Sequence, residues 1–227
     1  RRLRKNKVAM VSLFVIIVVM IFSFIVPAFY PYDYKTQIKG SENLHPMQYS
    51  EKEIERMDAG EKVFPHVLGT DKMGRDYAIR VMMGSRISLL VGLIATAIIF
   101  VIGSLIGSIS AFFGGWVDLI IMRIVDIIST IPLTLYVILI MQVLGAGIQS
   151  IIVALGSVYW VDMARVVRGQ ILSLKQQEFV LAAKTIGSSA TTILFDHLIP
   201  NALGSILVTI TMLIPSAIFM EAFLGYL

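Results

Sequence analysis

The sequence contains several long segments without a charged side chain, and these constrain its fold more than any other feature. The longest are Val8 to Ile25, Ile87 to Phe113, Ile127 to Leu144 and 201–220. A helix needs about 20 mainly apolar residues to cross the hydrocarbon core of a bilayer. Because backbone groups in lipid must be paired within their own segment, each of these segments is predicted to be a transmembrane helix.

A fifth uncharged segment, Ile148 to Val161, is shorter and reaches spanning length only with its flanks. The prediction is therefore an all-α fold, a polytopic transmembrane helical bundle with five spans. Only 15% of the residues are charged, whereas soluble domains have about a quarter. Cysteine is absent and the three histidines show no ligand spacing, so no metal site is predicted.

The placement of charge predicts how the spans are oriented. Five cations and no acids precede the first span, namely Arg1, Arg2, Arg4, Lys5 and Lys7. Because positively charged flanks stay in the cytoplasm, the N-terminus is predicted to be cytoplasmic. Alternation of the spans then places residues 27–86 outside the cytoplasm, and the connections 114–126 and 162–200 inside.

Three regions follow from these spans. Residues 1–26 are the basic N-terminus and the first transmembrane helix, and residues 27–86 are an extracytoplasmic loop with an amphipathic helix. Residues 87–227 are the core transmembrane domain, which contains a cytoplasmic loop at about 165–200. Because the chain starts without methionine and stops inside an apolar segment, it is expected to be a piece of a longer protein.

Residues 178–200 form a short, mildly polar passage between two apolar runs. One short helix is predicted from Lys175 to Ile186, and Gly187 suits the left-handed turn that ends a helix. Ser188 or Ser189 can then cap the next helix by accepting a bond from its free amide groups. The passage is predicted to be a helix-turn-helix that lies against the membrane.

Two neighbouring small residues, Ala182 and Ala183, are predicted to lie exposed on the first helix of this passage. Small side chains permit close insertion of a helix into the groove of a partner, and Glu178 adds one directional charge. The simpler alternative is an interfacial amphipathic helix that only connects two spans. The residues alone leave both alternatives open.

The same positions resemble a motif of a known family. Glu178-x3-Ala182-Ala183-x3-Gly187, followed by Ile199-Pro200, is similar to the EAA loop in the membrane subunits of ABC importers. In that family the loop forms coupling helices, which sit in a cleft on the ATP-hydrolysing subunit and transmit its closure to the pore. The resemblance implies that Glu178, Ala182, Ala183, Gly187 and Pro200 belong to a coupling loop.

A second segment resembles, more narrowly, the C-type subunit of the dipeptide/oligopeptide permease family. It is the run LGTDKMGRD, in which the family positions are Gly69, Thr70, Asp71, Gly74, Arg75 and Asp76. The likeness covers nearly the whole chain and implies a bundle of the type I ABC importer kind, with a sixth span expected after Leu227. Two departures, Ile79 in place of serine and Phe179 in place of tyrosine, remove no named functional position.

Charged side chains around this second segment are expected to have a structural role rather than to contact substrate. Thr70 or Asp71 is predicted to cap an amphipathic helix through Arg80. The side chains of Asp71, Arg75, Asp76 and Arg80 are expected to pair with one another or with the partner permease. Near the inner end of the third span, Arg123 and Asp126 have the i,i+3 spacing of a membrane-boundary ion pair on one helix face.

The second apolar run also contains Gly103, Gly107 and Ala111, which are small residues four positions apart. This spacing lets the backbones of two helices approach closely. Close helix packing is therefore predicted, with lining of a pore as the alternative.

The resemblance implies a pore-forming permease subunit that imports oligopeptides or dipeptides across a bacterial-type cytoplasmic membrane. Its implied partners are a second homologous permease, two ATP-binding subunits, an extracytoplasmic peptide-binding protein, the peptide and membrane lipid, without nucleic acid. The sequence has no phosphate-binding GxxxxGK[ST] motif and no catalytic cluster. The chain is therefore predicted to be non-catalytic and without a cofactor of its own, so that ATP and Mg are bound by the partner subunits. The alternatives are a nickel or metal-chelate importer and, from another class, an ATP-independent channel or a membrane scaffold.

Overall fold

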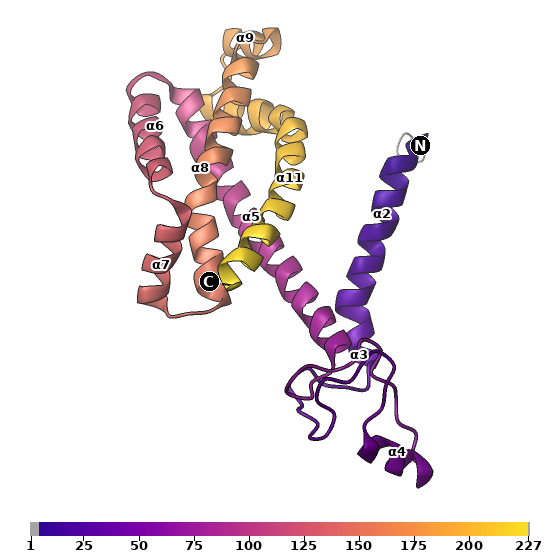
Figure 1. The fold of residues 1–227 in the computed structure, drawn as a ribbon. Helices are drawn as coiled ribbons and strands as arrows, with labels where there is room; N and C mark the ends of the chain where they lie inside the picture. Colours follow the sequence, from indigo (N-terminus) through magenta and orange to yellow (C-terminus); the bar gives the residue numbers. More distant parts are fainter. Residues whose placement is uncertain (1–4, 227) are drawn as a thin grey trace. The chain divides into compact units, whose positions relative to one another are not determined.

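A computed structural model describes residues 5–226, so Arg1, Arg2 and Arg4 of the basic N-terminus lie outside the described residues. The chain divides into two compact units, residues 1–88 and 89–227, called here the N-terminal and C-terminal units. The described residues are mainly helical and contain no strand, only two isolated β-bridges. The predicted all-α fold is therefore confirmed (Figure 1).

The first apolar run of the N-terminal unit is helical throughout. Its three consecutive elements are α2 (Lys7–Met20), the π-turn η1 (Ile21–Ile25) and α3 (Val26–Phe29). The N–H of Val26 bonds to the carbonyl of Ile21, five residues earlier. Pro27 follows at once, and a proline ring has no N–H and collides with the carbonyl four residues before it. The wider π-turn relieves that collision within the span.

Residues 30–76, called here the 30–76 segment, are mostly irregular and contain one short helix, α4 (Glu51–Asp58). A capping box starts this helix, because the Ser50 side chain and the Glu53 side chain each bond to the backbone of the other residue. A small apolar cluster of Ala78, Ile79 and Met82 follows the segment, packed against Phe22 and neighbouring aromatic residues.

The longest helix, α5 (Tyr77–Phe113), has 37 residues and continues through the boundary between the two units. The prediction of a separate amphipathic helix through Arg80, before a span starting at Ile87, is wrong in this respect. Asp76 caps α5, since its Oδ1 accepts a hydrogen bond from the Ile79 N–H at 3.0 Å. Thr70 and Asp71 instead belong to the loop that precedes the cap.

The predicted third span is divided in the structure. α6 (Gly115–Thr130) and α7 (Leu133–Leu144) meet at an angle of 86°. Sequence reasoning placed residues 114–126 in a connection and missed that they are helical from Gly115 onward. The break has a local cause, because a residue before proline avoids the helical region, and Ile131 has φ −85° and ψ 122° before Pro132.

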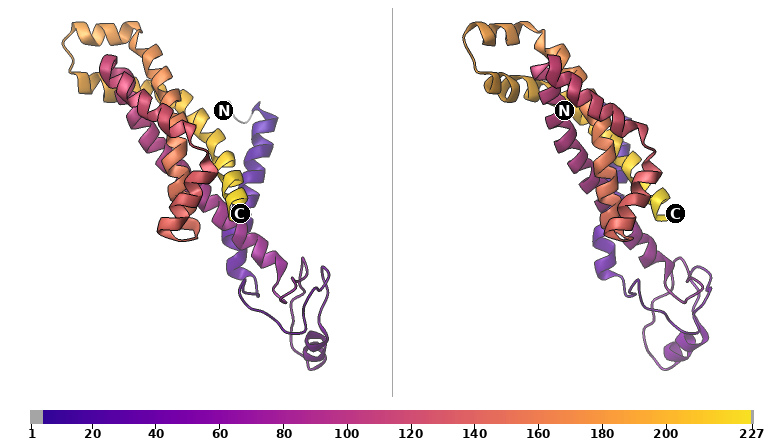
Figure 2. Two further views of the ribbon diagram at one scale, coloured as in Figure 1. Left: turned by 60° about the vertical axis from the view of Figure 1, so that its left-hand side comes forward. Right: turned by 90° about the vertical axis from the view of Figure 1, so that its left-hand side faces the viewer.

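The rest of the C-terminal unit consists of α8 (Ile148–Lys175), α9 (Glu178–Thr185), α10 (Ala190–Thr192), η2 (Ile193–Leu198) and α11 (Ile199–Tyr226). α8 is twice the length of the predicted fourth span, because its polar second half stays helical. Within residues 5–226, four helices are long and apolar enough to cross a membrane, or up to five if the bent pair α6–α7 is one span. α9 lies at one end of α8 and the α7–α8 connection lies at the other (Figures 1 and 2).

The two glycines of α5 that are spaced four residues apart, Gly103 and Gly107, lie directly against α8. A Cβ added to Gly103 would lie 2.6 Å from Cβ of Met163, and one added to Gly107 would lie 2.4 Å from the carbonyl oxygen of Ala164. Such distances leave no room for a side chain, so the predicted close packing is confirmed. Around this contact, α5, α8, α9, η2 and α11 share one buried apolar cluster.

Candidate functional site

The helix α9 is held in place by two apolar side chains on one of its faces. Val180 is fully buried and Ala183 is 6% exposed, and both belong to the cluster that also contains Val167 and Ile171 of α8. Ala183 was predicted to be exposed together with Ala182, and this prediction is wrong for Ala183. Neighbouring residues point about 100° apart on a helix, and here Ala183 faces the core while Ala182 faces away from it.

The opposite face of α9 is uncovered. Glu178, Leu181, Ala182 and Thr185 are all exposed, and their i, i+3, i+4, i+7 spacing places them on one side of the helix. Leu181 is 54% exposed, and Ile186, just after the helix, is 82% exposed. An exposed apolar surface beside one charge is typical of a contact surface for another protein.

The turn after α9 has the hydrogen bonds of a Schellman motif. Gly187 has φ +81°, its N–H donates to the carbonyl of Lys184, and the N–H of Ser188 donates to the carbonyl of Ala183. Ser189 caps the next helix by accepting a hydrogen bond from the Thr192 N–H at 3.2 Å. The predicted helix-turn-helix is therefore present, although α8 and α9 are separated by Gln176 and Gln177.

The passage continues into α11 through η2, whose residues Ile193, Leu194 and Leu198 are buried. The N–H of Ile199 bonds to the carbonyl of Leu194, five residues earlier, immediately before Pro200. This is the same arrangement as in the first span, where a π-turn also precedes a proline. Pro200 thus lies at the start of α11 without interrupting it.

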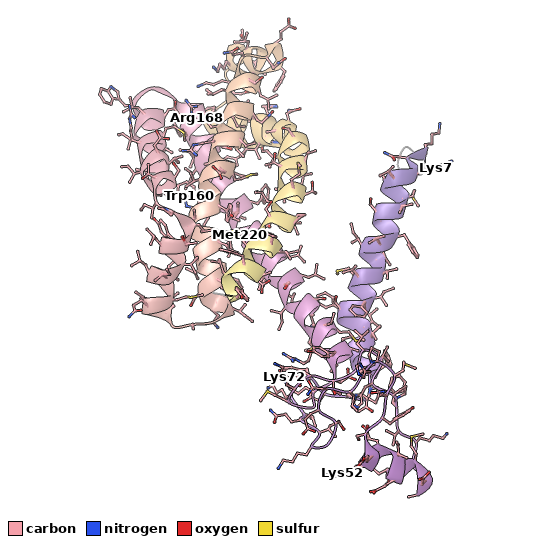
Figure 3. The ribbon with its side chains drawn as sticks, in the orientation of Figure 1. Lys7, Lys52, Lys72, Trp160, Arg168 and Met220 are labelled. Atoms are coloured by element: carbon pink, nitrogen blue, oxygen red, sulfur yellow. The ribbon has the colours of Figure 1, made fainter. Side chains whose placement is uncertain are left out.

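A bidentate ion pair connects α8 to the beginning of α6. Nε and Nη2 of Arg168 donate to the two carboxylate oxygens of Asp118, each at 2.5 Å, and Ser110 of α5 donates to Asp118 Oδ1 at 2.5 Å. Arg168 lies near the α9 end of α8 (Figure 3). Sequence reasoning did not pair these residues, because Asp118 and Arg168 are 50 positions apart and no local spacing relates them.

Lys175, seven residues after Arg168, connects the last turn of α8 to the end of α5. Its Nζ donates to the carbonyl oxygens of Ala111 at 3.2 Å and of Phe112 at 2.6 Å. The last carbonyls of a helix have no partner within the helix and form its negative end, so a cation there is favourable. Lys175 also lies 5.7 Å from the centre of the Phe112 ring.

Arg123 and Asp126 do not form the predicted membrane-boundary pair. Asp126 Oδ1 accepts from Nη2 of Arg165 on α8 at 3.1 Å, and no ion pair within residues 5–226 joins it to Arg123. Helical side chains lean toward the N-terminus, so Arg123 leans away from a carboxylate that lies three residues after it. Arg165 comes from another helix and has no such restriction.

The LGTDKMGRD segment in the N-terminal unit requires glycine at both of its glycine positions. Gly69 has φ +76° and Gly74 has φ +70°, a region that other residues rarely adopt. A Cβ at Gly69 would lie 2.2 Å from the carbonyl oxygen of Leu44, and one at Gly74 would lie 2.3 Å from that of Ile38. Thr70 Oγ1 adds a hydrogen bond from the Leu44 N–H at 2.9 Å. The motif therefore holds the 30–76 segment together.

The Asp71 carboxylate accepts several hydrogen bonds within and beside the loop between these glycines. Its Oδ1 accepts the N–H groups of Met73 at 2.8 Å and of Arg75 at 3.0 Å, and its Oδ2 accepts Nε of Arg75 at 2.8 Å and Nη1 of Arg80. Burial alone would raise the pKa of Asp71, but these donors outweigh it and lower the pKa to about 2. The expected pairing of Asp71 with Arg75 and Arg80 is confirmed.

A buried histidine lies between two buried carboxylates, and sequence reasoning missed it. Nδ1 of His66 lies 2.8 Å from Oδ2 of Asp76, and Nε2 lies 3.0 Å from Oε1 of Glu53. The His66 side chain is 0% exposed, and the Tyr32 ring stacks on it at 4.4 Å between centres. Since each ring nitrogen faces its own carboxylate, the arrangement is that of a protonated imidazole between two acceptors.

The protonation of His66 should make the stability of the 30–76 segment depend on pH. Burial would lower its pKa, but the hydrogen bonds and charges of Asp76 and Glu53 outweigh burial and raise it. A histidine whose pKa is raised by folding stabilises the folded state fully at pH values below its unfolded pKa, which is about 6.5. This contribution to stability is lost as the pH rises through the pKa of the folded state. Asp71, with its pKa of about 2, and Tyr32, whose pKa is raised to about 12 by burial and by Glu53 and Asp76, do not titrate in this window.

We therefore expect hydrogen exchange of the 30–76 segment, corrected for intrinsic rates, to show falling protection between pH 6 and pH 9. His66→Gln, which cannot be protonated, should lower the protection throughout this range and remove its dependence on pH. Equal protection of the unmodified chain at both ends of the range would contradict the expectation.

Comparison with known proteins gives consistent matches along the chain. Residues 103–227 match the family described as binding-protein-dependent transport system inner membrane component, and residues 1–46 match the N-terminal TM domain of oligopeptide transport permease C. The chain is 44% identical over 226 residues to the oligopeptide transport system permease protein OppC of Bacillus subtilis (strain 168), covering 100% of this chain and 69% of that protein.

Two further relatives are similar at comparable levels. The dipeptide transport system permease protein DppC of Bacillus subtilis (strain 168) is 40% identical over 227 residues, with 66% of its length covered. The OppC protein of Escherichia coli (strain K12) is 39% identical over 227 residues, with 70% covered. The chain thus spans about two thirds of the length of these relatives. It belongs to the binding-protein-dependent transport system inner membrane components, as a multi-pass inner-membrane permease of the dipeptide/oligopeptide family and of its C type.

Proposed function

We propose that this chain is the pore-forming, non-catalytic permease subunit of an ATP-driven importer of oligopeptides or dipeptides. The relatives named above are permease proteins of oligopeptide and dipeptide transport systems, which supports the substrate class. The observation that carries the coupling role is the geometry of α9. This helix is seated on buried Val180 and Ala183, and its opposite face leaves Leu181 and Ala182 uncovered.

Under this proposal the N-terminus and α9 lie in the cytoplasm, and the 30–76 segment lies outside it. Two ATP-binding subunits bind ATP and Mg and dock on the permeases, and a second homologous permease completes the pore. An extracytoplasmic peptide-binding protein delivers the peptide to the outer face. The basic residues Lys5 and Lys7 before the first span support this orientation, because such residues favour the cytoplasmic side.

Coupling needs a rigid connection between α9 and the spans. Only Gln176 and Gln177 separate α9 from α8, and Val180 and Ala183 are packed in the same cluster as Val167 of α8. A displacement of α9 by a closing ATPase is therefore passed to α8 rather than absorbed by a loop. ATP binding then shifts the population between inward-open and outward-open arrangements of the helices.

Ala182→Trp is expected to remove docking of the ATP-binding subunits and to leave the permease folded. Ala182 is exposed, so a large side chain there meets the partner and not the core of this chain. We expect the ATPase that co-purifies with the complex to fall about tenfold or more, which corresponds to about 1.4 kcal/mol of lost binding. The level of the permease in the membrane should not change.

Two matched substitutions separate docking from folding. Ala146→Trp changes an exposed alanine in the α7–α8 connection, at the opposite end of α8, and should leave ATPase binding unchanged. Ala183→Trp changes a buried alanine and should lower the amount of folded permease itself, because overpacking a core is destabilising. Undiminished co-purification of the ATPase with Ala182→Trp would refute the proposed docking face.

A further inference from the structure

The α9 end of α8 is connected to the rest of the C-terminal unit at two polar contacts. Arg168 binds Asp118 through two hydrogen bonds of 2.5 Å, and Lys175 binds the carbonyls of Ala111 and Phe112. Arg168 and Lys175 are seven residues apart, or about two turns, so they lie on the same face of α8. Both contacts reach the corner where α5 ends and α6 begins.

This corner is short and has an unusual backbone conformation. α5 ends at Phe113 and α6 starts at Gly115, with Gly114 at φ +65° and Gly115 at φ +54° between the two helical directions. A Cβ on either glycine would have nothing within 4 Å, so neighbouring side chains do not hold the glycines in place. The polar contacts from α8 and the hydrogen bond from Ser110 to Asp118 therefore add to the packing of Ala111 and Phe112 in the apolar cluster at this corner.

The strength of the Arg168–Asp118 contact distinguishes it from the other ion pairs near it. Its side chains are 32% and 19% exposed, and a bidentate guanidinium–carboxylate pair is among the stronger hydrogen-bonded contacts. The Arg165–Asp162 pair on the same helix is 39% and 66% exposed, with a single contact of 3.3 Å. Exposed single contacts of that kind contribute little.

We propose that Asp118, Arg168 and Lys175 form a clamp that transmits the displacement of α9 to the α5–α6 corner, and thereby to the helices of the transport path. The clamp rests on the proposed function of α9 as the coupling helix. Its three members are positioning residues, since they touch neither the ATPase surface on α9 nor a substrate. When α9 is pushed, α8 carries Arg168 and Lys175 with it, and the corner follows.

The clamp predicts uncoupling and not loss of assembly. In the complete transporter reconstituted in lipid vesicles with its binding protein, Asp118→Asn should retain the ATP-binding subunits at the wild-type ratio. ATP hydrolysis should continue, while peptide transported per ATP hydrolysed should fall roughly tenfold, the factor that corresponds to about 1.4 kcal/mol of lost coupling. Arg168→Lys, which keeps the charge but cannot bind bidentately, should show an intermediate ratio.

Further variants distinguish transmission from a general structural role. Exchanging the charges, as Asp118→Arg with Arg168→Asp, should restore part of the transport-to-ATP ratio that either single change loses. Asp162→Asn, an exposed carboxylate on the same helix, should leave the ratio at the wild-type value. Lys175→Met tests the second contact independently and should also lower the ratio.

The possible failures are distinguishable. If Asp118→Asn and Lys175→Met assemble and transport peptide at the wild-type ratio, the clamp is refuted while α9 can still be the docking helix. If the two variants lose the ATP-binding subunits and transport together, their role is structural and the clamp is also refuted. If Ala182→Trp leaves ATPase binding intact, the proposed function of α9 fails instead.

Discussion

Replacing His66 with alanine is expected to unfold much of the 30–76 segment. The side chains of Glu53 and Asp76 are 4% and 1% exposed, and His66, when protonated, is the cation between them. Removing one partner of a buried ion pair leaves an uncompensated charge and costs about 3–5 kcal/mol. We therefore expect hydrogen exchange of the backbone amides in this segment to become faster by roughly a hundredfold or more.

The chain offers a matched control for this prediction. His45 lies in the same segment and its side chain is exposed, so His45→Ala should leave exchange unchanged. A triple change that also replaces the two carboxylates, His66→Leu with Glu53→Gln and Asp76→Asn, should recover part of the protection because no charge is left buried. Wild-type exchange in His66→Ala would mean that the histidine does not hold the segment together.

Replacing Gly107 with leucine is expected to separate α5 from α8 and to destabilise the C-terminal unit. A Cβ at this position would lie 2.4 Å from the carbonyl oxygen of Ala164 and 3.0 Å from Cβ of Val167. The first of these is a backbone atom and cannot rotate away, so one helix must shift. Overpacking a core by a few methylene groups costs about 1–3 kcal/mol of stability. We expect the cost of Gly107→Leu to be at the upper end of this range, because two spanning helices must shift.

Thermal unfolding of the purified permease in detergent measures this effect. Gly84→Leu is the control, because Gly84 lies on the same helix with nothing within 4 Å of an added Cβ. That variant should unfold at or above the wild-type temperature, since leucine favours a helix over glycine by about 0.8–1.0 kcal/mol. An unfolding temperature of Gly107→Leu equal to that of the wild type would show that α5 and α8 are not closely packed there.

Much of the fold was predictable because it depends on local sequence. The uncharged runs predicted the spanning helices, since the thickness of a bilayer sets the length that a helix needs. Gly187 predicted the end of α9, because a left-handed residue is needed for the two hydrogen bonds of that turn. The resemblance around Glu178 and Asp71 predicted the family, which the comparisons confirm.

The ends of the helices were less predictable, because charged residues were taken to mark the connections between helices. Residues 115–126 and 162–175 contain charged side chains and are nevertheless helical. Two of their carboxylates pair with cations from another helix, as Asp118 does with Arg168 and Asp126 does with Arg165. The positions of charged residues therefore located the ends of the apolar spans better than they located the ends of the helices.

The sequence by itself determined that this protein is a helical membrane permease with a short helix-turn-helix at 178–200, because span length, turn chemistry and family motifs are properties of neighbouring residues. Only the tertiary structure decided which of Ala182 and Ala183 is buried, which cation binds Asp126, and that His66 lies between Glu53 and Asp76. These outcomes depend on which helix or loop packs against which, and contacts between residues tens of positions apart leave no periodic signal in a single sequence.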